Sequence, residues 1–173
     1  MHSFLELAHE ELKRTDHLIY VSLKYTRTVD VLQTILNRLI KCFEFSLKAL
    51  IKKLVELGEI DIAPNNVLSS LSLIKEKYPN PDFISMINFF MIMRRIVKEE
   101  PVKSNEFRRG VRMSCVINKI VYEVDIDTAE EYFKTTEVFL RIVKKLIDEP
   151  KLDLDQLKEL IQGVMIDIEF ERG

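Results

Sequence analysis

The residues of this chain with the clearest chemical potential are basic, and they gather between positions 94 and 112. The arginines of this stretch are Arg94, Arg95, Arg108, Arg109 and Arg112. Guanidinium groups bind phosphate through paired hydrogen bonds, and the Arg108-Arg109 pair lies between Phe107 and Gly110. We therefore treat the five arginines as a candidate site for RNA or nucleotide phosphate. The alternative is that they are solvated or paired within the chain, because the helix dipole alone favours arginines at a helix end.

No other set of residues indicates catalysis, a metal or a cofactor. The four glycines are isolated, so no glycine-rich loop is present to hold a nucleotide. Of the histidines His2, His9 and His17, the last two are about two helical turns apart, which is too far to share a metal, and two cysteines cannot fill a tetrahedral site. We expect no catalytic residues, no metal and no cofactor. An enzyme with a site assembled from His17 and scattered carboxylates is the least favoured alternative.

Composition predicts one mainly helical domain. The chain has 173 residues, 47% of them hydrophobic, and only four glycines and five prolines, too few for the many tight turns of a β-sandwich. The formal net charge of −2 gives no global attraction to nucleic acid or to an anionic membrane. No apolar run has the length of a membrane span, and the first residues do not resemble a signal peptide. We expect a cytoplasmic protein, and the Lys, Glu and Ile content is typical of a thermophile.

Two long helices are predicted at the N-terminus. Ser3 and Glu6 form a capping box for the first helix, and apolar residues at helical spacing cover residues 29–57 for the second. Gly58 provides a natural end for the second helix. Thr26 and Thr28 can each cap a new helix, so we expect a break between the two helices near residues 25–28.

A second apolar stripe on the long second helix predicts an interface. Its residues lie on a different face from the main stripe and are Val31, Ile35, Cys42, Phe45 and Ala49. A helix that is apolar on two faces must be covered on two sides. It is therefore either central to a bundle or in contact with a second subunit, and we assign these five residues to a homodimer interface.

A β-hairpin is predicted at about residues 108–126. Apolar and polar residues alternate on both sides of Asn118-Lys119, which is typical of two strands and a two-residue turn. Pairing of Ile117 with Ile120 places the apolar residues on one face and sets Arg112 opposite Asp125. The fold class is thus mainly α, a helical bundle with two long N-terminal helices and one β-hairpin insertion.

The remaining helices have recognisable boundaries. A short helix is expected at residues 67–78, and Asn80-Pro81 opens an almost wholly apolar helix that reaches about residue 97. After the hairpin, Thr128 and Glu131 are expected to cap a helix that ends before Pro150. Asp153 and Gln156 open a short last helix at residues 154–162, followed by a strand or a continuation of the helix. We divide the chain into a bundle domain, residues 1–150, and a C-terminal arm, residues 151–173.

Residues 11–30, ELKRTDHLIYVSLKYTRTVD, resemble a family of small archaeal proteins without an assigned function. The resemblance extends through Phe107-Arg108-Arg109 to the helix that ends near Glu149. More distantly, two long helices followed by shorter ones are similar to HEPN domains. This similarity implies a helical dimer, of a kind that includes toxin ribonucleases and partners of small nucleotidyltransferases. The HEPN nuclease motif pairs an arginine with a histidine four to six residues downstream. No histidine follows Arg27, and Arg14 and His17 are separated by only two residues. The resemblance therefore implies no nuclease activity.

Two hypotheses follow. The first is a non-enzymatic helical interaction module, a homodimer or the partner of another protein. The alternative is an RNA- or nucleotide-binding HEPN-like protein, of the toxin–antitoxin type or an inactive relative of a ribonuclease, that uses the arginine cluster. We expect no membrane partner for either.

Overall fold

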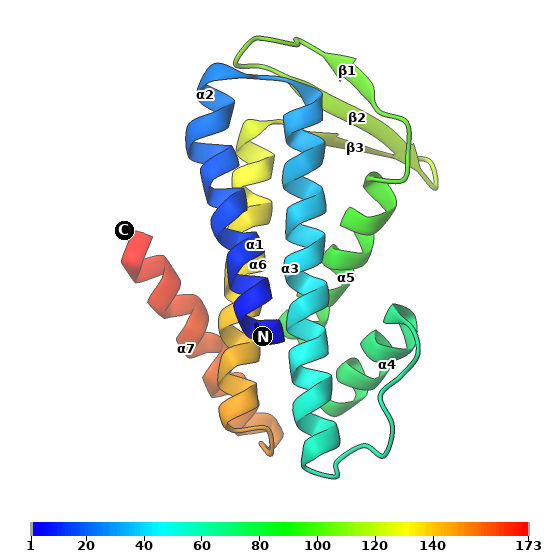
Figure 1. Ribbon diagram of the computed structural model, residues 1–173, viewed down its shortest axis with the longest axis vertical. Coiled ribbons are helices and arrows are strands. Elements are labelled where there is room, and N and C mark those ends of the chain that lie inside the picture. Colours follow the sequence, from blue (N-terminus) through cyan, green and yellow to red (C-terminus); the bar gives the residue numbers. More distant parts are fainter. Residues whose placement is uncertain (1, 173) are drawn as a thin grey trace.

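The computed structural model describes residues 2–172 and shows a bundle of long helices with a small sheet at one end (Figure 1). Helix α1 (Phe4–His17) begins at the predicted capping box, in which Ser3 accepts from the Glu6 amide and the Glu6 carboxylate accepts from the Ser3 amide. It continues through a π-helical turn, η1 (Leu18–Ser22), into α2 (Leu23–Tyr25). A wider turn of this type has no local sequence signature, and it was not predicted.

Helix α3 (Val29–Glu56) is the central element of the bundle, as the length of its apolar pattern indicated. The expected break before it is confirmed, because residues 26–28 leave the helix and the Thr28 hydroxyl caps the Val31 amide at 3.3 Å. The expected end is confirmed as well, since Gly58 takes a positive φ of 73° just after the last turn. Only glycine adopts that conformation without steric cost.

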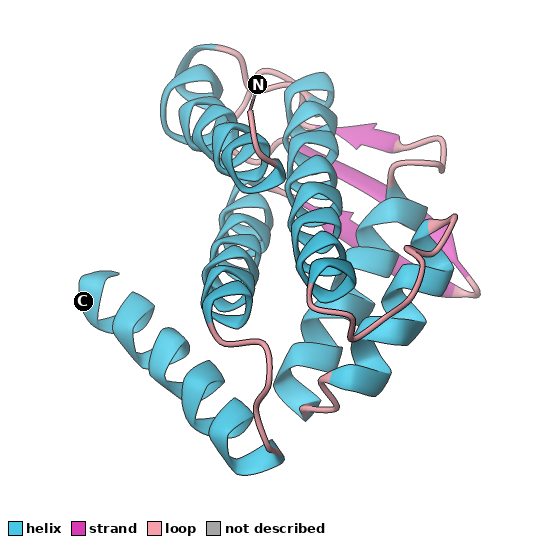
Figure 2. Cartoon of the chain, turned by 60° about the horizontal axis from the view of Figure 1, so that its bottom comes forward, coloured by secondary structure: helices cyan, strands magenta, loops and turns pink. Residues whose placement is uncertain are grey.

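The second apolar stripe of α3 is covered by this same chain. Helices α1 and α6 pack along α3 (Figures 1 and 2), so Ile35 and Cys42 are fully buried and Ala49 is 9% exposed. Val31 and Phe45 are half-buried, and the Phe45 ring stacks on Phe4 of α1 with centroids 6.5 Å apart. The requirement that α3 be covered on two sides is therefore satisfied by other helices of this chain. The stripe that the sequence assigned to a second subunit forms part of the core.

Two capped helices follow α3. In α4 (Val67–Lys77) the Asn66 side chain caps the Ser69 amide at 2.8 Å. In α5 (Pro81–Ile96) Asn80 is the N-cap and accepts from two backbone amides, and Pro81 occupies the first helical position, as predicted. The aromatic residues of α5 reach the centre of the bundle and stack there on α3 and α6. The stacked pairs are Phe43–Phe90 at 5.1 Å, Phe43–Phe139 at 4.3 Å and Phe83–Phe139 at 5.4 Å.

The sheet has three antiparallel strands in the order β1-β2-β3: β1 (Val102–Ser104), β2 (Arg112–Ile117) and β3 (Ile120–Val124). The predicted hairpin and its register are confirmed, because Ile117 pairs with Ile120. Asn118 and Lys119 both have positive φ, 51° and 67°, which is the geometry of a tight hairpin turn. Strand β1 was not predicted, because three residues are too few for an alternating pattern. It lies on the outer side of β2.

The junction between the sheet and α6 (Ile126–Asp148) corrects one expectation. Asp125 caps α6 by accepting from the Thr128 amide at 2.8 Å, so the helix starts earlier than a Thr128 cap allows. The register places Arg112 opposite Asp125, as expected, but the Arg112 guanidinium bonds Glu123 at 3.2 Å. The Asp125 carboxylate is used by the helix that follows.

The last helix is α7 (Leu154–Arg172), and its start is the predicted Asp153–Gln156 capping box. Of the two alternatives for the residues after 162, the continuation of the helix is confirmed, because α7 runs on through Gly163. One side of α7 packs on α6, where the two helices are joined by ion pairs, and the helix runs along the edge of the bundle (Figure 2). Within residues 2–172, no helix has both the length and the apolar character needed to cross a membrane.

Candidate nucleic-acid interface

The loop of residues 105–110, which joins β1 to β2, has an unusual and well-defined backbone. Asn105 and Phe107 both have positive φ, 53° and 68°. The loop is closed by hydrogen bonds from the Arg108 amide to the Asn105 carbonyl at 3.1 Å and from the Asn105 side-chain amide to the Gly110 carbonyl at 3.2 Å. For a bulky residue such as Phe107 the left-handed conformation costs about 1–2 kcal/mol. Residues held in this way often belong to functional sites.

The 105–110 loop is fixed against the start of α3. The Phe107 amide donates to the Arg27 carbonyl at 2.7 Å, and the Glu106 carboxylate accepts from the Val29 amide at 3.0 Å. Val29 is the first residue of α3, so the Glu106 charge lies at the positive end of the helix dipole. Just before the loop, Lys103 pairs with Asp30 at 3.6 Å. The loop is therefore held in place from the N-terminus of the longest helix.

This anchoring brings two exposed aromatic rings and three arginines to the same end of the molecule. Phe107 is 77% exposed and is followed by the exposed Arg108 and Arg109, while Tyr25, 85% exposed, and the half-buried Arg27 come from the segment that the loop contacts. We call these five residues the Phe107 surface. In the described part of the chain, none of its three guanidinium groups forms an ion pair. The arginines are therefore available to an anion.

The other predicted arginines are placed elsewhere. Arg112 lies in β2, where it bonds Glu123 and where its Nε atom is buried without a hydrogen-bond partner among the described residues. Arg94 and Arg95 are in the last turn of α5, and the Arg94 guanidinium lies 5.8 Å from the Phe90 ring of its own helix. Figure 1 shows that α5 ends beneath the sheet, whereas the loop after β1 crosses above α2 and α3. Of the five arginines, the structure thus brings Arg108 and Arg109 together on one loop.

Tyr25 and Arg27 were not recognised from the sequence. They are about eighty positions from Phe107, and only the hydrogen bond between the Phe107 amide and the Arg27 carbonyl makes them neighbours. The one local signal was the Asn105 to Gly110 segment, whose end residues both favour turns. That signal predicts a loop, but it does not say which part of the chain the loop contacts.

The chain offers no further set of groups suited to catalysis in the part that the structure describes. No cluster of three or more His, Cys, Asp or Glu residues there could hold a metal ion. Burial raises the pKa of the Cys42 thiol to about 12, so that thiol is not a nucleophile near neutral pH. The His2 ring forms a hydrogen bond with Glu6 at 3.2 Å.

Comparison of the chain with models of protein families, with curated proteins and with solved structures finds no match in any of the three.

Proposed function

We propose that this protein binds single-stranded RNA through the Phe107 surface. The observation that carries the proposal is the conformation of Phe107, an aromatic residue held in a costly backbone geometry with its ring 77% exposed between two segments that carry arginines. The loop hydrogen bonds hold the backbone in place, but folding gains little from an exposed ring, so packing does not account for a phenylalanine at this position. Stacking of a base on the ring does account for it.

A single strand fits the Phe107 surface better than a duplex does. Unstacked bases present their faces to aromatic side chains, and each base–aromatic stack contributes about 1–3 kcal/mol. Tyr25 and Phe107 offer two such rings, and Arg27, Arg108 and Arg109 can bind the phosphates between the bases. Because the formal net charge is −2, attraction to RNA has to come from this surface and not from the molecule as a whole.

The test is the salt dependence of binding to a labelled oligouridine, measured by fluorescence anisotropy between about 50 and 200 mM salt. Three phosphate contacts predict a slope of log affinity against log salt of about −2. Replacing Arg108 and Arg109 together with glutamine should bring the slope to about −0.7. Phe107→Ala should weaken binding roughly five- to 100-fold at every salt concentration without changing the slope.

The matched control is Arg95→Gln, which removes an exposed arginine from the same sequence cluster but from outside the Phe107 surface. We expect it to leave both the slope and the affinity unchanged. Binding that is insensitive to salt, or that is unaffected by loss of the Phe107 ring, would contradict the proposal. A preference for duplex over single-stranded RNA would contradict it too.

A homodimeric interaction module is the second candidate, and it is supported by the outer side of α7. Ile166 and Phe170 are 63% and 87% exposed there, although the opposite side of the same helix is buried on α6. Ion pairs from Arg141 to Glu171 and from Arg172 to Glu137 hold the end of α7 in position. An exposed apolar stripe on a fixed helix is typical of a protein interface. Light scattering that found only monomer at micromolar concentration, with Ile166→Ser behaving identically, would remove this candidate.

A further inference from the structure

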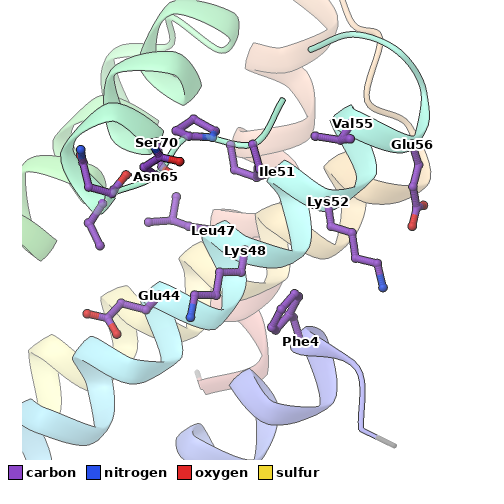
Figure 3. A pocket seen from close by; sticks show the side chains of 14 residues that line it. Phe4, Glu44, Leu47, Lys48, Ile51, Lys52, Val55, Glu56, Asn65 and Ser70 are labelled. Atoms are coloured by element: carbon purple, nitrogen blue, oxygen red, sulfur yellow. Dashed lines mark hydrogen bonds between the residues drawn. The ribbon is translucent and has the colours of Figure 1, made fainter. Parts of the chain in front are cut away.

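A groove of about 670 Å³ lies over the C-terminal half of α3 (Figure 3). One wall is α3 itself, the second is the start of α1, and the third is the segment that leads into α4. The side chains that give it an apolar lining are Phe4, Leu47, Ile51, Val55, Pro64 and Val67. Pockets of roughly 300–1,000 Å³ with a mostly apolar lining are typical of small-molecule sites.

Two lysines stand at the mouth of the groove. Lys48 and Lys52 are exposed and one helical turn apart on α3, and neither forms an ion pair with another described residue. The Lys48 ammonium lies 5.9 Å from the Phe4 ring, which lines the groove, and 5.8 Å from the Phe45 ring, which does not. Figure 3 shows Lys48 and Lys52 on the side of the groove where Phe4 lies.

The opposite wall adds a second source of positive potential. Asn66 is the N-cap of α4, and Asn66, Val67 and Ser70 all line the groove. The first turn of a helix carries a partial positive charge from its free amides. Glu44 and Glu56 also line the groove, but they lie one turn beyond the lysines at its two ends. The positive potential is therefore concentrated in the middle of the groove.

The charge order along α3 disfavours a second copy of this helix as the occupant. The charges at four-residue spacing along this stretch are negative at Glu44, positive at Lys48 and Lys52, and negative at Glu56. In an antiparallel pair centred on this stretch, Lys48 of one copy faces Lys52 of the other, and Glu44 faces Glu56. Like charges directly opposed are unfavourable. The complementary occupant has a single negative group at the centre and an apolar body.

We propose that this groove binds a medium-chain fatty carboxylate, with the carboxylate between Lys48 and Lys52 and the alkyl chain along Leu47, Ile51 and Val55. The α3 wall from Leu47 to Val55 extends about 12 Å, which suits a chain such as that of decanoate. The ammonium groups supply charge-assisted hydrogen bonds to the head group. The alkyl chain displaces water from the half-buried side chains of the lining, which are Phe4, Val55, Pro64 and Val67, and it also contacts Leu47 and Ile51, which are 3% and 5% exposed. This site is separate from the Phe107 surface and does not depend on RNA binding.

The test is calorimetric titration of the full chain with free carboxylates of increasing length, each below the concentration at which it forms micelles. From octanoate to nonanoate to decanoate, the dissociation constant should fall about fourfold for each added methylene. Decanol and decyltrimethylammonium keep the chain but lack the anion, and both should bind about three- to tenfold more weakly than decanoate. Methyl resonances of Leu47 and Ile51 should shift on addition of decanoate.

Lysine variants separate the role of charge from that of the apolar lining. The double variant Lys48→Gln with Lys52→Gln should bind decanoate about three- to tenfold more weakly and should bind decanol with unchanged affinity. Lys41→Gln, which removes an exposed lysine of α3 outside the groove, should have no effect. All three lysines are exposed, so the variants are expected to fold as the parent does.

Several results would overturn the proposal. One is failure of decanoate to bind, and another is equal affinity for decanoate and decanol. A third is binding of decanoate with no shift at Leu47 or Ile51. If an acidic amphipathic peptide, or vesicles of anionic phospholipid, shifted those methyl groups while free decanoate did not, the groove would be a peptide or membrane site and the assignment would be wrong.

Discussion

The left-handed backbone of Phe107 leads to a stability prediction that can be worked out from the structure. The left-handed conformation, with φ 68°, is unfavourable by about 1–2 kcal/mol for a residue with a Cβ, whereas glycine adopts it without this penalty. Glycine loses about 0.5–1 kcal/mol more than alanine in chain entropy on folding. Phe107→Gly should therefore be about 0.5–1 kcal/mol more stable than Phe107→Ala. Because the ring is 77% exposed, neither variant gives up much buried surface.

The assay is urea unfolding followed by circular dichroism, with linear extrapolation of the free energy of unfolding to water. For a chain of this size the expected difference corresponds to about 1–4 °C in Tm. Glu159, exposed within α7, provides the control pair, because there alanine should be more stable than glycine by about 1 kcal/mol. If alanine were the more stable residue at position 107 as well, the loop would not have the backbone described, and the strain argument would be refuted.

RNA affinity should respond in the opposite direction to stability. Phe107→Gly keeps or improves the fold but removes the ring, so binding to oligouridine should fall roughly five- to 100-fold, as it does for alanine. If Phe107 had a purely structural role, its substitution would not preserve stability and at the same time weaken RNA binding. A glycine variant that bound RNA as tightly as the parent would show that stacking on Phe107 plays no part.

Three further predictions concern the core and two titrating groups. Phe43→Ala should lower the free energy of unfolding by about 3–5 kcal/mol in chemical denaturation, because Phe43 is fully buried and stacks on two other rings. Burial raises the pKa of Tyr78 from 10.0 to about 12, and its hydroxyl donates to the Pro150 carbonyl at 2.9 Å. The stability from neutral Tyr78 is complete below pH 10 and is lost as the pH rises towards 12, so the alkaline decline in stability should be shallower in Tyr78→Phe. The Thr128 amide lowers the pKa of Asp125 below its ordinary 3.8, so the contribution of that carboxylate is present above this pH and is lost as the pH falls through the folded-state pKa. Unfolding measured between neutral and acid pH should therefore show a smaller acid loss in Asp125→Asn.

Local signals in the sequence were reliable where a few neighbouring residues determine the structure. The Ser3 capping box, the Asn80-Pro81 helix start and the Ile117–Ile120 register are all present as predicted. Each depends on side chains that bond a backbone within three or four residues, or on a period that repeats along one segment. Such signals predict a mainly helical bundle in which a hairpin is inserted in the second half of the sequence.

Where a residue or an apolar stripe could have either of two structural roles, contacts between distant segments decide which role it has. Asp125 had the right spacing to pair with Arg112 and the right position to cap α6, and the helix uses it. The second stripe of α3 could face a partner or a neighbouring helix, and α1 and α6 cover it. The periodicity of a stripe specifies that it must be buried, but it does not specify by what.

The sequence by itself determined where most of the helices begin and end, how the hairpin is paired, and that arginines gather near it. Only the tertiary structure decided which arginines are neighbours, because Arg27 reaches Phe107 through a hydrogen bond between segments far apart in the chain. The groove beside Lys48 arises in the same way, from α1, α3 and the segment before α4. Caps and periods act over a few residues, whereas sites form where the packing of the core places separate segments side by side.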